Sequence, residues 1–301
     1  MALAFVDKFS KGFRLDGGDP SASYQMVPLN GERDLIVQTD QSPAVLSVQD
    51  TARCVMRSFK LLDSGAPLPV GTAHSVRLPV NATVRFTVQG TAPGFTGLNL
   101  VESSEFQIST SMTISVKPVK RVTFCFVFLA DLVRKNVRGQ IEPRFLMDSV
   151  KKIYSEQANV DLQELGHVRD VTVLRDLGNP LITSDDKNLD AIEAATTEET
   201  FRAFDFIVYC CWNVEHIRGQ SGTRGIAIDR FSTKKRYAFI EVSNATFAQQ
   251  VHVLAHEIGH VLSLSHTKDN GLMFPTTASQ SNRLFGGDIE VVNPPPGGFV
   301  P

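Results

Sequence analysis

Three histidines and one glutamate lie within eleven residues near the end of the chain, in the segment HEIGHVLSLSH at positions 256–266. On an α-helix, His256 and His260 are one turn apart on the same face, so their imidazoles can share one metal ion. Glu257 is rotated by about 100° from His256, so its carboxylate lies beside the ion rather than on it. The spacing therefore predicts two zinc ligands and one general base.

A third ligand is available six residues after His260, at His266. A straight helix would carry residue 266 about 240° round and about 9 Å along from residue 260, away from the ion. We therefore predict that the helix breaks near Ser263. Glycine enters the left-handed region needed for such a break freely, whereas serine there costs about 1 kcal/mol.

The pattern HExxHxxxxxH, with a methionine seven residues after the last histidine, resembles the metzincin clan of zinc endopeptidases, and most of all its matrixin-type branch. The resemblance covers about residues 119–285, and Ser263 replaces the glycine of the clan's pattern. It implies one catalytic Zn²⁺ held by His256, His260 and His266. It also implies that Glu257 is the catalytic base and that Met273, in GLMFP, lies in the turn beneath the metal.

The implied reaction is hydrolysis of a peptide bond. Zinc held by three imidazoles keeps an open position for water, whose proton Glu257 would take as the water attacks the carbonyl. The resemblance further implies that a peptide binds as an added strand along residues 222–229, contacting Gly225, Ile226 and Ala227. The loop after Pro275 would then form the wall of the pocket for the substrate residue that follows the cut.

The elements that would position these residues start at Arg121, where strand and helix patterns begin to alternate. Alternation of this kind predicts a mostly parallel α/β sheet. The resemblance implies that this is the twisted sheet of a metzincin-like α/β (α+β) domain at 118–285. Thr246 and Gln249 form a capping-box pattern at the start of the metal-binding helix. The predicted strands are 122–130, 170–174, 205–212, 222–229 and 237–242, and the predicted helices begin at Pro143, span 189–204 and begin near Thr246.

The regions before and after this domain have a different residue pattern and composition. Residues 1–117 contain short alternating runs separated by turn residues, which predicts an antiparallel, all-β, sandwich-like accessory domain. Residues 286–301 are rich in proline and glycine, so we expect an extended tail.

Composition excludes some functions. A net charge of −2 and a pI near 6.4 give no global field for nucleic acid, and no window reaches the length of a membrane span. We expect a protein or peptide substrate, no nucleic acid, and an unidentified docking partner for the first domain. Four scattered cysteines indicate buried free thiols rather than a disulfide framework.

The N-terminus shows no Sec-type signal pattern. If the protein is exported as an effector or toxin, we therefore expect a specialised secretion route. Three alternatives stay open at this point. His252, one turn before His256, could complete a closed structural zinc site. The chain could be a non-catalytic zinc-bearing binding protein. It could also be a zinc hydrolase that acts on a non-protein amide.

Overall fold

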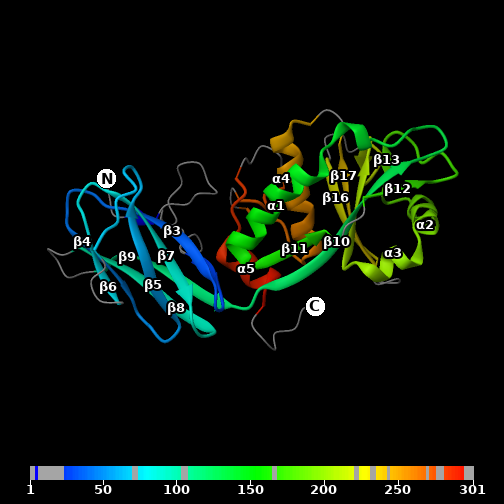
Figure 1. Ribbon diagram of the computed structural model, residues 1–301. Coiled ribbons are helices and arrows are strands. Elements are labelled where there is room, and N and C mark those ends of the chain that lie inside the picture. The colour runs from blue at the N-terminus through cyan, green and yellow to red at the C-terminus, as the bar shows by residue number, and fades with distance from the viewer. Residues whose placement is uncertain are drawn as a thin grey trace. The chain divides into compact units, whose positions relative to one another are not determined.

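The computed structural model divides into two compact units (Figure 1). The first contains the described residues up to Lys120, together with Glu156–Asn159 and 283–294, and the second contains Arg121–Ser155 and the described residues from Val160 to Asn282. The structure describes residues 4–5, 24–69, 74–102, 108–164, 168–219, 224–230, 235–242, 245–268, 271–275 and 281–294.

The first unit is built from two sheets that share one apolar core. One has the strand order β1-β3-β7-β5 and the other β2-β9-β8-β4-β6. Alternate residues of both sheets are buried in the same cluster, for example Val37 and Phe86 from the first sheet and Leu46 and Leu100 from the second. The strands are β1 Ala4–Phe5, β2 Tyr24–Pro28, β3 Glu32–Gln38, β4 Ala44–Val48, β5 Cys54–Leu61, β6 Ser75–Leu78, β7 Thr83–Gly90, β8 Gly94–Glu102 and β9 Ile108–Lys117.

The predicted β-rich N-terminal region is confirmed, with one departure from the antiparallel pattern. β2 pairs with β9 in parallel, in the register Tyr24 with Thr113 through Pro28 with Lys117. Every other pairing given between named strands of the two sheets is antiparallel. The alternating pattern of a strand fixes which face is buried but not the direction of its partner, so the sequence could not reveal this pair.

The prediction of an extended tail from residue 286 was wrong for its first part. Gly286–Val292 forms the helix α5 and belongs to the first unit. Asp288 accepts a hydrogen bond from the Phe285 backbone amide at 3.1 Å, which caps the helix start, while Ile289 and Val292 are fully buried. The proline and glycine content of 286–301 predicts an extended tail, but the acidic cap and the apolar pair three residues apart favour a helix over its first part. Residues 295–301 lie outside the described part of the chain.

The second unit is a mixed α/β structure whose central sheet has the order β11-β10-β14-β17-β16, with β12 also paired to β10. β10 pairs in parallel with β12 and β14, β14 pairs in parallel with β17, and β16 is antiparallel to β17 at the edge. The main strands are β10 Lys120–Ala130, β11 Val160–Glu164, β12 Arg169–Thr172, β14 Phe206–Cys211, β16 Gly225–Arg230 and β17 Lys235–Glu241. A short parallel pair, β13 Leu181–Ile182 and β15 Val214–Glu215, lies outside this sheet.

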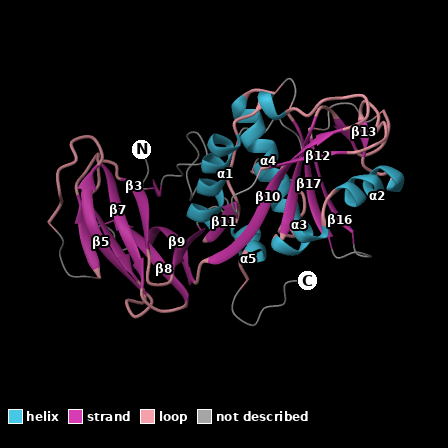
Figure 2. Ribbon diagram, turned by 45° about the vertical axis from the view of Figure 1, so that its right-hand side comes forward, coloured by secondary structure: helices cyan, strands magenta, loops and turns pink. Residues whose placement is uncertain are grey.

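The helices α1 and α4 lie on one side of this sheet, and α2 and α3 lie on the other (Figure 2). The predicted single helix at 189–204 is two helices, because Thr196 and Thr197 interrupt it. The Thr197 side chain accepts a hydrogen bond from the Thr200 amide and so starts a new helix. The bounds are α1 Pro143–Ala158, α2 Asp186–Ala195, α3 Glu198–Ala203 and α4 Phe247–Val261, with a 3₁₀ turn at Arg138–Gln140.

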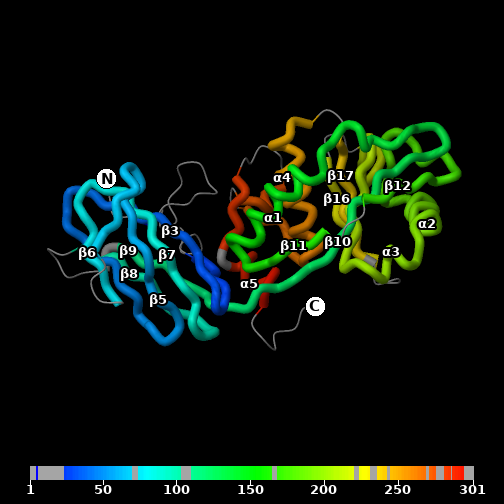
Figure 3. Tube along the Cα trace, viewed as in Figure 1, coloured from blue at the N-terminus to red at the C-terminus, as the bar shows by residue number. Residues whose placement is uncertain are grey.

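The helix α4 carries the metal-binding motif and is fixed at its start and along its length. Thr246 and Gln249 form the predicted reciprocal capping box. Further along, the Tyr154 hydroxyl of α1 donates a hydrogen bond to the Ala255 carbonyl at 2.5 Å, so the two helices lie side by side (Figure 3). Leu254 and Ile258 are fully buried, which gives α4 its core-facing stripe.

All four cysteines are free and buried, as expected for thiols in strand cores. Burial raises the pKa of the Cys54 thiol to about 11 and that of Cys125 to about 12, so neither is a thiolate at neutral pH. Among the helices of the described residues, none is long and apolar enough to span a membrane.

The cap at Thr246 gives a first test. Replacing Thr246 with alanine removes the acceptor for the Gln249 amide, so we expect the free energy of unfolding of the second unit to fall by about 1 kcal/mol. Urea unfolding measures the change. Thr246→Ser keeps the acceptor and serves as the control. Equal stability of the alanine and serine variants would contradict this role.

Candidate metal centre

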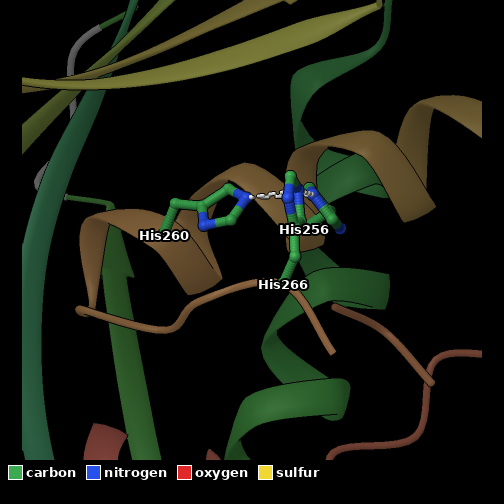
Figure 4. Close-up of side chains that lie close together, drawn as sticks. All are labelled: His256, His260 and His266. Carbon is green, nitrogen blue, oxygen red and sulfur yellow. Dashed lines mark hydrogen bonds between the residues drawn. The ribbon is translucent and has the colours of Figure 1, made fainter. Parts of the chain in front are cut away.

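His256, His260 and His266 bring their Nε2 atoms together into a nearly equilateral triangle (Figure 4). The Nε2 atom of His260 lies 3.1 Å from that of His256 and 3.1 Å from that of His266. The remaining side, between His256 and His266, is 3.2 Å. The three predicted ligands therefore meet at one point, although they come from a helix and from the chain beyond its end.

The other ring nitrogens fix which atoms are available. Nδ1 of His256 lies 2.7 Å from the Leu272 carbonyl oxygen, and Nδ1 of His260 lies 2.7 Å from that of Leu264. Each Nδ1 therefore donates its hydrogen to a carbonyl, which leaves a lone pair on Nε2. Burial lowers the pKa of His256 to about 4 and also lowers that of His260, so both rings are neutral at pH 7.

This arrangement fits zinc. In a tetrahedral site with Zn–N bonds of about 2.0–2.1 Å, two ligand nitrogens are about 3.3 Å apart, close to the 3.1–3.2 Å found between the three Nε2 atoms. Two lone pairs directed at one another at this distance repel unless a cation lies between them. The carbonyl groups of Leu264 and Leu272 supply the outer hydrogen bonds that orient zinc-binding imidazoles.

The predicted break of the helix is at Ser263, whose φ of 76° lies in the left-handed region. The Leu264 amide donates to the Gly259 carbonyl and the Ser263 amide to the His260 carbonyl, each at 2.9 Å. These two bonds define a Schellman motif, in which serine occupies the position that is usually glycine. The chain therefore reverses at this point, and His266 returns to the ion instead of continuing along the helix axis.

Met273 lies directly against the helix α4. It is fully buried, and the Phe274 amide donates to the Gly271 carbonyl at 3.2 Å to close a turn around it. A Cβ atom at Gly259 would lie only 2.5 Å from the Met273 sulfur. Gly259, next to His260 in the sequence, therefore allows the methionine to approach the helix.

Glu257 is outside the ligand triangle and packs against the edge strand β16. The Ala227 backbone amide donates a hydrogen bond to its carboxyl group. A Cβ atom at Gly225 would lie 2.7 Å from the Oε1 atom of Glu257, so this strand passes very close to the glutamate. Burial raises the pKa of Glu257 to about 8, with the Ala227 amide acting in the opposite direction.

His252 is not part of the metal-binding group found among the described residues. Its Nδ1 atom lies 3.0 Å from the Asn282 side-chain oxygen, so the ring already has a protein partner. The alternative in which His252 is the fourth ligand of a closed site therefore has no support in the structure.

Sequence reasoning missed the residues that position the ligands without touching the ion. Gly259 and Tyr154 are the clearest cases, because both contact the region beneath the metal site. A glycine inside an apolar helix is a signal that could have been used, since its helix propensity is poor and a close packing contact is a common reason for its presence. The carbonyl groups of Leu264 and Leu272 carry no such signal. Every residue has a backbone carbonyl group, so the sequence does not show which of them accept hydrogen bonds from the histidines.

An α/β framework that presents three converging imidazoles and an adjacent glutamate is typical of zinc hydrolases. The sequence model of the matrixin family, peptidase family M10, matches residues 188–293, which contain this site. The resemblance inferred from the motif is thereby confirmed for that stretch. The match supports a zinc metallopeptidase, and therefore a hydrolase with a protein substrate. No curated protein matches the chain.

Similarities to solved structures are weak. Domains 4 and 5 of the S-layer protein SbsC show 13% identity, cover 32% of this chain and 42% of their own, and give a TM-score of 0.22. A multicopper oxidase from Campylobacter jejuni shows 14% identity, 31% and 20% coverage, and a TM-score of 0.23. The seventh PapD-like domain of human CEP192 shows 11% identity, 38% and 95% coverage, and a TM-score of 0.22. This chain thus spans less than half of the first two, and TM-scores this low establish no common fold.

The turn at Ser263 predicts a gain in stability. Ser263→Gly removes the steric cost of the left-handed conformation but adds freedom to the unfolded chain, so we expect a net gain of about 0.5–1 kcal/mol in the free energy of unfolding. Ser263→Val should have the opposite effect. Urea unfolding of both variants checks the prediction. A glycine variant less stable than the natural protein would contradict the role of this backbone conformation.

The triangle of nitrogens predicts one zinc ion per chain. At a zinc concentration of about 100 times the dissociation constant, binding should stabilise the second unit by about 2.7 kcal/mol. His266→Ala should greatly reduce this effect, whereas His216→Ala, outside the triangle, should not. Thermal unfolding with and without zinc provides the measurement. Full stabilisation of the His266 variant would exclude this histidine as a ligand.

Proposed function

We propose that this chain is a zinc-dependent endopeptidase that hydrolyses peptide bonds with Glu257 as the general base. The observation that carries the proposal is the division of roles on α4. Three Nε2 atoms converge within 3.2 Å of one another, and the neighbouring glutamate lies outside that triangle. A purely structural zinc site has no need for a base beside it, which favours the enzyme over the non-catalytic binding protein.

His256, His260 and His266 would hold a single zinc ion. When bound, zinc supplies Lewis-acid chemistry, because it lowers the pKa of water and polarises a carbonyl group. The residues of the chain supply the rest. The Leu264 and Leu272 carbonyls keep two of the imidazoles in the tautomer that leaves Nε2 free.

In its ionised form, Glu257 would accept a proton at its carboxylate from the attacking water and later transfer it to the leaving amine. The positive charge of a bound zinc ion would lower the pKa of this group from about 8 and so favour the ionised form. The Ala227 amide holds this carboxyl group in place. The side chain is only 6% exposed, so bulk water competes little for it. Burial and a nearby cation both shift the pKa of a carboxyl group, and a protein can use these shifts to match that pKa to proton transfer.

The substrate would bind as an extended strand along β16. This strand forms the edge of its sheet, and its residues Gly225–Ile228 are partly exposed. An edge strand offers unpaired backbone groups to a peptide, which gives affinity with little dependence on side chains. Gly225, Ile226 and Ala227 would contact the peptide, and the same strand holds Glu257 through Ala227. Binding and proton transfer would therefore use one element.

The wider biological role remains a prediction. We propose that the β-rich first unit serves docking and that the protein acts as an exported effector or toxin. A zinc hydrolase that acts on a non-protein amide would share the same metal centre. The test below separates it from a peptidase, because only a peptidase cleaves a mixture of denatured proteins.

Glu257→Ala gives the decisive test of the proposed reaction. We expect cleavage of denatured protein to fall by about 10²- to 10⁴-fold, since this is the usual contribution of a general base. Zinc content should stay at one ion per chain, because the glutamate is not a ligand. Mass spectrometry of the cleaved mixture and metal analysis of the same samples measure both quantities.

Glu241→Gln is a matched control, because Glu241 is a half-buried glutamate on β17 that lies outside the metal-binding group. It should retain both cleavage and zinc. A Glu257 variant that cleaves at the natural rate would overturn the assignment of the base. Bound zinc with no cleavage in any form would favour the binding protein.

A further inference from the structure

The last turn of the metal-binding helix α4 has a partner for each of its final carbonyl groups. The last four carbonyls of a helix find no partner within it. Three of them accept hydrogen bonds from backbone amides of the turn, each at 2.9 Å: Ile258 from Leu262, Gly259 from Leu264 and His260 from Ser263. The fourth, that of Val261, accepts a hydrogen bond from the Arg236 guanidinium at 3.1 Å. The helix end is therefore completed by a side chain from β17.

The same guanidinium contacts the edge strand β16. Its Nη1 atom donates to Val261, and its Nε atom lies 3.3 Å from the Oδ2 atom of Asp229. Asp229 and Arg236 are direct partners in the antiparallel pair of β16 and β17, so their side chains lie on the same face of the sheet. Their side chains are 41% and 32% exposed, so the ion pair adds little stability by itself. Its effect is to orient the guanidinium towards the end of α4.

The next residue of β16 is held on the other face of the sheet. Successive side chains of a strand point to opposite faces, and α2 and α4 lie on opposite sides of this sheet (Figure 2). Arg230 forms ion pairs of 2.9–3.6 Å with three carboxylates of α2: Asp186, Asp190 and Glu193. Arg230 and Arg236 therefore attach the same end of β16 to different helices. This arrangement provides a matched control for the contact with α4.

The edge strand and the metal-binding helix meet at two places. At the first, the Ala227 amide donates to the carboxyl group of Glu257. At the second, Arg236 joins Asp229, two residues after Ala227, to Val261, four residues after Glu257. A shift of the strand end relative to α4 would therefore move the amide that holds the proposed base.

We propose that Arg236 is a positioning residue that links the edge strand β16 to the turn that brings His266 to the metal. Two separate effects follow. The contact with Val261 stabilises that turn and therefore the position of the third zinc ligand. The contact with Asp229 keeps β16 in place beside Glu257. The first effect is independent of the proposed peptidase function, and the second rests on it.

The first experiment measures the zinc affinity of the full-length protein by competition with a chelator. In Arg236→Met the Val261 carbonyl loses its cationic donor, so part of the binding free energy must order the turn, and we expect zinc to bind about fivefold more weakly. Arg236→Lys, which can still donate to the carbonyl, should recover most of the affinity. Arg230→Met frees the same end of β16 from α2 and should change the affinity by less than about twofold. Equal losses in the two methionine variants, or no loss in Arg236→Met, would overturn the proposal.

The second experiment measures cleavage of one peptide at saturating zinc, so that zinc affinity does not limit the rate. Asp229→Asn is a mild, nearly isosteric change that removes the charge holding Arg236. We expect kcat to fall about fivefold, while zinc affinity changes by less than about twofold. KM should also change by less than about twofold, because Gly225–Ile228 remain paired with β17.

The link between the two side chains predicts a further result. Arg236→Met should lower kcat at saturating zinc by the same factor as Asp229→Asn, and the double variant should show no further loss. A merely structural contact would lower the temperature of unfolding and leave kcat unchanged. That outcome would contradict the positioning role.

The two experiments separate the two possible failures. If the natural protein cleaves no peptide, the proposed function fails, and the zinc measurements still decide whether Arg236 supports the turn. If the natural protein cleaves the peptide and Asp229→Asn keeps the full kcat, the peptidase stands and the link from Arg236 to the edge strand is rejected.

Discussion

The metal centre depends on one backbone conformation, the left-handed turn at Ser263. Two ligands one turn apart are a local property of any helix, but the third must come from a chain that has reversed direction. The hydrogen bonds from Leu264 to Gly259 and from Ser263 to His260 end the helix and make that reversal. The Leu264 carbonyl then accepts the Nδ1 hydrogen of His260. The turn that brings in His266 therefore also orients His260.

Each face of the helix α4 makes a different set of contacts. Its apolar stripe, with Leu254 and Ile258, packs into the core, and its metal-binding face carries His256 and His260. Glu257 is directed towards β16. Gly259, with no side chain, leaves room for Met273. Because His256, Glu257, Gly259 and His260 all lie on this one helix, their relative positions are fixed by helix geometry, and only His266 and Met273 come from the chain beyond its end.

Much of the site could be predicted from the sequence, because its central features are short-range. The spacing of His256 and His260, the rotation of Glu257 and the need for a break near Ser263 all follow from 3.6 residues per turn. The capping box at Thr246 is equally local, and the structure contains it. The mixed α/β character of the second unit could be predicted too, because each strand and each helix has its own local pattern of apolar residues.

The features that the sequence could not reveal depend on long-range contacts. The parallel pairing of β2 with β9 joins residues almost ninety positions apart, such as Tyr24 and Thr113. The helix α5 starts at two glycines and is stabilised by the burial of Ile289 and Val292. The partner of His252 is Asn282, thirty residues away. In each case the decisive partner is absent from the local pattern, so local reasoning favoured a simpler structure.

The most direct measurement is X-ray absorption at the zinc edge of the zinc-loaded protein. The account predicts three imidazole nitrogens at about 2.0–2.1 Å and one further light atom from solvent. The spectrum of His252→Leu should be the same, because this histidine contacts Asn282 instead of the metal. A first shell with four imidazoles, or with only two, would contradict the central claim that the turn at Ser263 completes an open three-histidine site.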